Sequence, residues 1–160
     1  MSLNKNFLSL DKFIHQALYS PKTGFYMKKN PFGDKGDFIT SPLISILFSE
    51  MLSVWTVAFW QNLKCPKNIN LIELGAGNGQ MMYDMINSFK SFPEFNKSCK
   101  FYIFETSPHL KKIQKEKLKR FNVIWIKNLN EIKKNYNIFI ANEFFDALPI
   151  KQFFKINKKW

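Results

Sequence analysis

Residues 71–79 of the chain read LIELGAGNG, and this stretch decides the fold. A short apolar run ends at Leu74, and glycines follow at positions 75, 77 and 79. Glycine has no Cβ, so a glycine-rich turn lets the backbone approach a ligand closely. The dinucleotide pattern GxGxxG would place its third glycine at position 80, where this chain has Gln80. The stretch therefore predicts a strand, a ligand-binding turn and a helix, with a tight structural turn as the alternative.

Outward from this stretch, short apolar runs alternate with segments of helical periodicity. Such alternation predicts an α/β domain with a parallel sheet and helices on both faces. The predicted strands are residues 69–74, 101–105, 123–126 and 137–141, with a possible fifth at 150–156. The helices between them are predicted over residues 79–89 and 108–121. Ligands of such sheets bind beyond the carboxyl ends of the strands, which is where the glycine turn lies.

The first 63 residues predict an N-terminal helical or lid segment, followed by the sheet domain of residues 64–160. Apolar residues at helical spacing predict a helix over residues 10–18, with Ser9 as its N-cap. Residues 26–38 hold a proline and two glycines among Lys and Asp, which is typical of a turn-rich loop.

A second helix is predicted to begin at Thr40, Ser41 and Pro42, a hydroxyl cap followed by proline. Residues 44–63 are about long enough to span a bilayer, but Glu50 lies among them. We therefore expect a buried helix and no membrane insertion. The residues expected to face the core are Ile44, Leu47, Phe48, Met51, Leu52, Trp55 and Phe59.

The length of 160 residues and the hydrophobic content of 46% indicate one folded core and exclude a disordered chain. Cys65 and Cys99 form no CxxC pair, so neither a disulfide framework nor a zinc cluster is predicted, and a reducing compartment fits. His15 and His109 have no companions at ligand spacing. We therefore predict no metal site.

The formal net charge of +12 raises the question of a nucleic-acid or anionic partner. Arg120 is the only arginine among the 24 basic residues, whereas base-edge and bidentate phosphate recognition rely on the guanidinium group. A lysine-rich composition also fits an AT-rich genome. We favour that interpretation and expect no nucleic-acid partner.

Polar side chains follow two further predicted strands. Glu105 ends one of them, where a carboxylate can accept both hydroxyls of a ribose; capping the next helix is the alternative. Asn142, Glu143 and Asp146 follow another, amid apolar residues. They are candidates for holding a substrate nitrogen, because a carboxylate can bind a guanidinium through two parallel hydrogen bonds. A helix cap by Asp146 and a structural Asn142 are the alternative.

These motifs together resemble the MidA/NDUFAF7 family, and the likeness covers nearly the whole chain in order. Its motifs are GFY at 24–26, GDFITSP at 36–42, ELGAGNG at 73–79, ETSP at 105–108 with Leu110 and Gln114, and NEFFDALP at 142–149. The GxGxG spacing also resembles the first motif of class I methyltransferases. The resemblance implies a Rossmann-like class I methyltransferase fold, S-adenosyl-L-methionine as cofactor and a protein substrate. It further implies symmetric dimethylation of an arginine on a respiratory complex I subunit during assembly.

The resemblance also implies roles for individual residues. Glu73, Gly75, Gly77 and Gly79 would line the methionine end of the cofactor, and Glu105 would hold its ribose. Asp37, Thr40 and Ser41 match the family's N-terminal motif and would close over the site. For catalysis, Glu143 would orient the guanidinium and accept charge, Asn142 would position it, and Asp146 would be the alternate acid.

The chain also departs from the family pattern. Leu43, Ile46 and Ser49 stand where the family usually has Glu, Gln and Gly. Family members continue well past position 160, so we expect a sheet truncated after its fifth strand. A non-catalytic cofactor-binding assembly module is therefore an alternative. The lysine-rich composition leaves an RNA methyltransferase as a second alternative. Because the likeness begins almost at Met1, we expect the bacterial cytoplasm, or the mitochondrial matrix for a eukaryotic protein.

Overall fold

A computed structural model of the chain describes residues 7–28, 31–33 and 36–159. The other residues of the predicted N-terminal segment and of its turn-rich loop lie outside the described residues. The helices are α1 (Leu10–Tyr19), α2 (Phe25–Lys28), α3 (Ser41–Ile44), α4 (Ile46–Asn62), α5 (Gln80–Phe89), α6 (Pro93–Ser98) and α7 (Pro108–Lys117), with 3-10 helices η1 (Leu129–Glu131) and η2 (Phe145–Ala147). The strands are β1 (Ile69–Leu74), β2 (Cys99–Phe104), β3 (Val123–Ile126) and β4 (Tyr136–Ile140).

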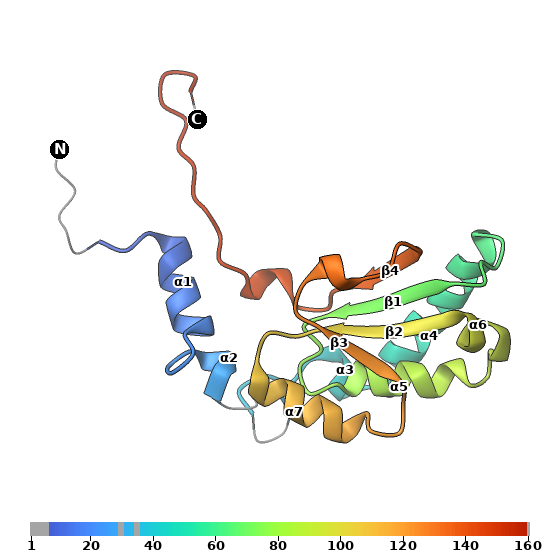
Figure 1. Cartoon of the computed structure of the whole chain (residues 1–160). Coiled ribbons are helices and arrows are strands. Elements are labelled where there is room, and N and C mark those ends of the chain that lie inside the picture. Colours follow the sequence, from blue (N-terminus) through green and yellow to red (C-terminus); the bar gives the residue numbers. More distant parts are fainter. Residues whose placement is uncertain (1–6, 29–30, 34–35, 160) are drawn as a thin grey trace.

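The four strands form one parallel sheet in the order β3-β2-β1-β4 (Figure 1). This confirms the four predicted strands, to within one or two residues at their ends. All six residues of β1 are buried, as expected of a central strand covered on both faces. Because the strands are parallel, their carboxyl ends meet at one edge of the sheet. The residues that follow β1, β2 and β4 come together there.

The two faces of the sheet are covered unequally. Residues of α4, α5 and α6, and Leu118 just after α7, pack with one face in the larger core, around Leu71 and Phe101. The opposite face presents Ile72, Leu74, Tyr102 and Ile126, and the residues packed against them include Ile132, just after η1, and Phe144, just before η2. In Figure 1 helices α4 to α7 accordingly lie on the same side of the sheet.

The predicted fifth strand is wrong. Within residues 150–156 only Ile156 takes part in a β-bridge, and its partner is the nearby Lys159. After Pro149 the chain runs away from the sheet (Figure 1), and Ile150, Phe153 and Phe154 are exposed. An apolar run becomes a strand only where it meets a partner edge, and this run does not reach β4.

The predicted apolar helix is broken in two and faces the opposite way from the prediction. Ser45 ends α3 and caps α4, its hydroxyl accepting a hydrogen bond from the Leu47 N–H at 3.2 Å. Thr40 precedes α3 but makes no capping bond through its side chain. The side chains of α4 that are buried are Ser49, Ser53, Thr56, Val57 and Trp60. Five of the seven expected core residues are exposed instead, namely Ile44, Leu47, Met51, Trp55 and Phe59.

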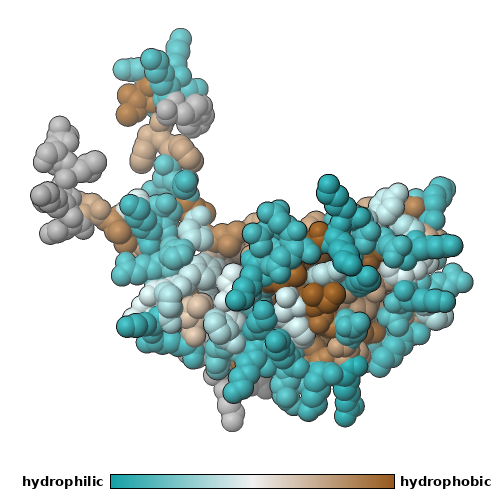
Figure 2. Space-filling model, viewed as in Figure 1, coloured by the Kyte–Doolittle hydropathy of each residue, from teal (hydrophilic) through white to brown (hydrophobic). Residues whose placement is uncertain are grey.

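The N-terminal helix α1 confirms the predicted helix, although the Ser9 side chain makes no capping hydrogen bond. The short helices α2 and α6 were not predicted. Among the described residues, no helix is both long enough and apolar enough to cross a membrane. Hydrophilic residues cover most of the face of the molecule seen in Figure 2.

Candidate functional site

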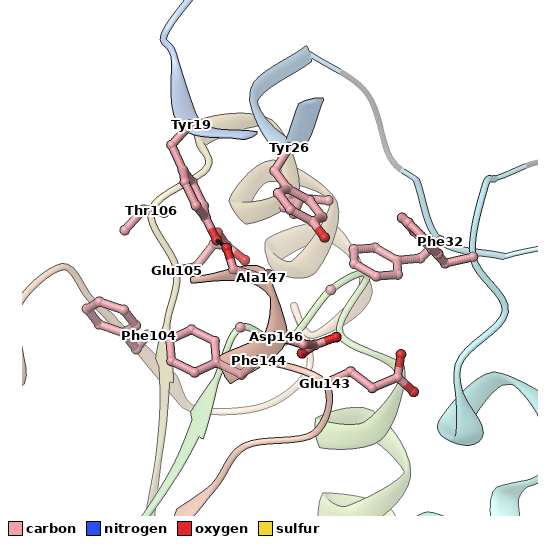
Figure 3. Close-up of a pocket in the computed structure, with 14 residues that line it drawn as sticks. Tyr19, Tyr26, Phe32, Phe104, Glu105, Thr106, Glu143, Phe144, Asp146 and Ala147 are labelled. Carbon is pink, nitrogen blue, oxygen red and sulfur yellow. Dashed lines mark hydrogen bonds between the residues drawn. The ribbon is translucent and has the colours of Figure 1, made fainter. Parts of the chain in front are cut away.

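Two adjoining cavities open at the carboxyl edge of the sheet. The larger, of about 760 Å³ including its open mouth, is shown in Figure 3; the glycine turn, Glu105, Glu143 and Asp146 line it. The smaller, of about 420 Å³, is lined by Thr40, Glu73 and Asn142 together with the same turn. Gly75, Gly77, Phe32 and Glu143 line both cavities. The edge of the sheet therefore holds one continuous site with two compartments.

The glycine turn takes a backbone conformation that side chains disfavour. Gly75, Gly77 and Gly79 have φ angles of +67°, +54° and +81°, all in the left-handed region. A Cβ at Gly75 would lie 2.7 Å from the Phe144 ring, and one at Gly77 would lie 3.3 Å from the Phe32 ring. Each of these two glycines therefore has an aromatic ring on one side and a cavity on the other. The turn needs glycine for its own packing as well as for a ligand.

Glu105 is held in place by two hydrogen bonds. Its Oε1 accepts from the Ser107 N–H at 2.8 Å, and its Oε2 accepts from Gln114 Nε2 at 2.9 Å. The residue is 7% exposed, and burial raises the pKa of its carboxyl while these hydrogen bonds oppose the rise. An oxygen of a carboxylate accepts more than one hydrogen bond. Glu105 is therefore a fixed acceptor at the edge of the larger cavity, with capacity left for a ligand.

Gln114 connects three parts of the site. Its Nε2 donates to Glu105 Oε2 and to the Gly77 carbonyl, both at 2.9 Å, and its Oε1 accepts from Trp125 Nε1 at 3.0 Å. The side chain is fully buried in α7. Gln114 thereby ties the glycine turn to Glu105, and it is a positioning residue.

We expect Gln114→Leu to lower the free energy of unfolding by about 3 kcal/mol or more, because three buried polar groups lose their partner. Urea unfolding followed by circular dichroism measures the change. Glu116→Gln on the same helix, whose partner Lys119 is also exposed, is the control and should leave stability unchanged. Equal stability of the Gln114→Leu variant and the native chain would mean that the network does not hold the site together.

Glu73 is the most unusual polar residue of the site. It is 3% exposed, and its Oε2 has no hydrogen-bond partner. Burial raises the pKa of its carboxyl to about 8; the nearby Glu105 adds to the rise and the Met82 N–H opposes it. A buried polar atom without a partner costs free energy, and a cationic ligand group would relieve that cost. Glu73 therefore points to a ligand with a positive group in the smaller cavity.

The residues after β4 supply the third set of polar groups. Asn142 lines the smaller cavity, Asp146 the larger, and Glu143 both. Glu143 has a φ of +48°, which few residues other than glycine adopt. Figure 3 shows the Glu143 and Asp146 carboxylates on the same side of the cavity, below the Tyr26 and Phe32 rings. Two carboxylates are therefore available beside the glycine turn.

Comparison with known proteins identifies the family. Residues 51–160 match the family model described as "Putative S-adenosyl-L-methionine-dependent methyltransferase". The chain belongs to this family. The resemblance on which the prediction rested is thereby confirmed.

Curated relatives agree with this assignment. The chain is 32% identical to the Xenopus laevis mitochondrial protein named protein arginine methyltransferase NDUFAF7, over 96% of this chain and 40% of that protein. The human protein of the same name is 30% identical over the same shares. The chain thus spans two fifths of the length of these relatives.

A solved structure shows the same fold. It is a COG1565 superfamily member from Burkholderia thailandensis with S-adenosyl-homocysteine bound. Its superposition on this chain gives a TM-score of 0.72 at 26% sequence identity, and the match covers 89% of this chain and 38% of the Burkholderia chain. The likeness confirms the predicted class I methyltransferase fold.

The structure brings most of the predicted site residues of this family member together, but not all. Thr40, Glu73, Gly75, Gly77, Glu105, Asn142, Glu143 and Asp146 line the two cavities. Gly79 lines neither; it precedes α5, and a Cβ there would lie 3.4 Å from Gln114 Cγ. Asp37 is exposed and Ser41 begins α3, and neither lines a cavity. Contact of these three residues with a ligand stays a prediction.

The sequence did not predict the aromatic side chains that line the larger cavity from the N-terminal segment, which we call the aromatic roof. They are Tyr19, Tyr26, Phe32 and Phe38 (Figure 3). Tyr19 donates its hydroxyl to the Ala147 carbonyl at 2.8 Å, and Ser107 Oγ donates to the Tyr26 carbonyl at 2.7 Å. Burial raises the pKa of Tyr19 to about 12, so its hydroxyl stays a donor. The motif GFY at 24–26 was the available signal, but nothing in its spacing indicated a cavity.

Proposed function

We propose that this chain binds S-adenosyl-L-methionine and takes part in methylating arginine on a protein. The observation that carries the proposal is the pair of buried carboxylates on either side of the glycine turn. Glu73 has an oxygen without a partner in the smaller cavity, and Glu105 is fixed beside the larger one. A ligand with an ammonium group at one end and ribose hydroxyls further along matches both carboxylates.

The residues present fit this cofactor along its length. Glu73 would hold the α-ammonium group of the methionine end, and the turn at Gly75 and Gly77 lies between the two compartments. Glu105 would accept the ribose hydroxyls, and the rings of Tyr26 and Phe32 offer apolar surface to the adenine. When bound, the cofactor supplies a methyl group on a positively charged sulfur. The protein must then align the acceptor nitrogen and exclude water.

Three residues after β4 are placed to handle the acceptor. A guanidinium is protonated at neutral pH and matches the fork geometry of a carboxylate. We assign Glu143 to orient the guanidinium and to stabilise the positive charge until a proton leaves, because Glu143 lines both compartments. Asn142 would position the group through its amide, and Asp146 is the alternate acid in the larger cavity.

The affinity for S-adenosyl-homocysteine should rise with pH, up to about tenfold per unit, between about pH 5 and pH 7. The pKa of Glu73 is about 8 in the free protein, so its carboxyl carries a proton over this range. A bound ammonium favours the ionised form, so binding releases that proton and strengthens as pH rises. Calorimetry in buffers of different ionisation enthalpy measures both the affinity and the proton release. Glu73→Gln should remove both pH effects; a flat native profile would contradict the assignment.

The relatives support a finer proposal for the whole protein. Their printed names specify arginine methylation and a mitochondrial location. We infer symmetric dimethylation of an arginine on a complex I subunit, in the mitochondrial matrix of a eukaryote or the cytoplasm of a bacterium. We also infer that residues 1–63 act as a lid on the methyltransferase part of residues 64–160. The Tyr19 to Ala147 and Ser107 to Tyr26 hydrogen bonds support the lid.

Labelling tests the acceptor. The chain is incubated with radiolabelled S-adenosylmethionine and a lysate of a matched cell, and labelled protein is hydrolysed for amino-acid analysis. We expect label on dimethylarginine. Label on lysine or on RNA would overturn the acceptor, and cofactor binding without any transfer would identify a non-catalytic assembly module.

RNA methylation receives no support from the charges around the site. Among the described residues, no lysine or arginine lines either cavity. The cations Lys90, Lys100, Arg120 and Lys133 instead line a groove that includes the first residues of β2. This groove lies toward the opposite ends of the strands.

A further inference from the structure

The outward face of α4 carries an apolar surface that no other described part of the chain covers. Figure 1 shows α4 on the helical side of the sheet, behind it in this view. Seven large apolar side chains along α3 and α4 are between 40% and 72% exposed. They are Ile44, Ile46, Leu47, Met51, Val54, Trp55 and Phe59. Trp55 and Phe59 stack on each other, with ring centroids 5.4 Å apart.

The inner face of the same helix explains why this surface points outward. Ser53 Oγ donates to the Ser49 carbonyl and Thr56 Oγ1 to the Leu52 carbonyl, both at 2.7 Å. These hydroxyls are satisfied within the helix and need no water. Ser53 and Thr56 can therefore be buried against the core, which leaves the large side chains to solvent. Ser49 is buried beside them, and its Oγ has no partner among the described residues. The exposed surface follows from how α4 is fixed, so α4 cannot simply turn to bury it.

We propose that α4 is the interface at which a second copy of this chain binds, with the two helices packed across a two-fold axis. Leu47, Met51, Val54 and Ala58 follow one another at spacings of four, three and four residues, the pattern of a helix that packs along another helix. The exposed Ala58 permits close approach of the two backbones. A two-fold interface uses the same surface on both copies. The exposed apolar face of α4 can therefore pack against the same face of a second copy without any other partner surface.

The size of the surface suits a stable dimer. A large apolar side chain has roughly 150–250 Å² of surface, so seven half-exposed ones present on the order of 600 Å². That is at the upper limit of the apolar patches found on monomers. Two copies would bury about 1,200 Å² in total before flanking residues are counted, which is the lower bound of specific stable interfaces.

The charge distribution favours a second copy over other occupants. The chain carries a formal net charge of +12, yet Glu50 is the only charged residue between Ser41 and Leu63. Two copies would repel each other across lysine-rich surfaces, whereas the α4 faces meet without opposing cations. A helix that binds an anionic membrane surface carries Lys or Arg beside its apolar face, and α4 has none.

The mass of the chain in solution tests the proposal. Size-exclusion chromatography with light scattering should give the mass of two chains at micromolar concentration and above. Met51→Glu and Val54→Glu should each give a monomer that keeps the native circular dichroism spectrum, because both side chains are already exposed. Their melting temperature should no longer rise with protein concentration. Phe153→Glu, which replaces an equally exposed apolar side chain far along the chain, is the matched control and should remain a dimer.

Three results would overturn the proposal. A dimer that survives Met51→Glu and Val54→Glu lies elsewhere, for example at the open edge of β4. A native chain that stays monomeric assigns the α4 face to another polypeptide. A monomer that sediments with anionic vesicles assigns the α4 face to a membrane.

Discussion

Gly75→Ala is expected to lower the affinity for S-adenosyl-homocysteine by about 100-fold or more. Alanine at this position adopts a φ of +67° at a cost of about 1–2 kcal/mol, and its Cβ would lie 2.7 Å from the Phe144 ring. The ring must move into the larger cavity, where the adenosyl group would lie. The strain lowers the stability of the free and the bound protein alike, so only the displaced ring acts on affinity. Overpacking of this kind costs about 1–3 kcal/mol, and the upper end of that range corresponds to a loss of affinity of about 100-fold. Equilibrium dialysis with radiolabelled ligand measures it.

Gly33→Ala is the control that separates the effect of backbone strain from the effect of crowding beside the cavity. Gly33 also has a positive φ, +98°, but nothing lies within 4 Å of its would-be Cβ. The control should therefore lose stability through backbone strain while ligand affinity stays within about threefold of the native value. Native affinity in Gly75→Ala would show that the ligand does not occupy the cavity beside the turn.

Glu143→Gln is expected to lower the rate of methyl transfer by about 100-fold or more while cofactor affinity stays unchanged. The amide cannot stabilise the positive charge on the guanidinium or accept its proton, and a positioned acid or base contributes about 100-fold or more. Single-turnover transfer of labelled methyl to the acceptor protein measures the rate, and calorimetry measures affinity separately.

Asp146→Asn is the matched control for this prediction. Asp146 lines only the larger cavity, so its change should affect transfer by less than about tenfold. If Glu143→Gln left the rate unchanged and Asp146→Asn abolished transfer, the two carboxylates would have exchanged roles.

Local pattern predicted the sheet well because each strand is a short, mostly apolar run between turn residues. The bounds of β1 and β3 match the prediction, since buried parallel strands are short apolar runs bounded by turn residues. The orientation of α4 was not predictable in this way. Its sequence is apolar nearly all round, and which face is buried depends on the fit of Ser49, Ser53 and Thr56 against α5. Periodicity measures hydrophobicity but does not measure closeness of packing.

Some residues of the site could likewise be predicted from the sequence, and others could not. Glu73, Glu105 and Asn142 follow from position, because the polar residues near the carboxyl ends of parallel strands converge on one sheet edge. The aromatic roof depends instead on contacts between distant segments, such as Tyr19 with Ala147 and Ser107 with Tyr26. No spacing rule encodes such contacts. Gly79 was assigned to the ligand from its motif; it lies outside the lining of both cavities, and its φ of +81° is what requires a glycine there.

Chemical-shift mapping by NMR tests most directly whether the two cavities hold the adenosyl cofactor. The ¹⁵N-labelled chain is titrated with S-adenosyl-homocysteine, and the amide shifts are followed. We predict saturable shifts at Gly75, Gly77 and Thr106, and none at Lys100 or Arg120 in the groove toward the far ends of the strands. A folded chain whose shifts do not change, or change only in that groove, would contradict the account.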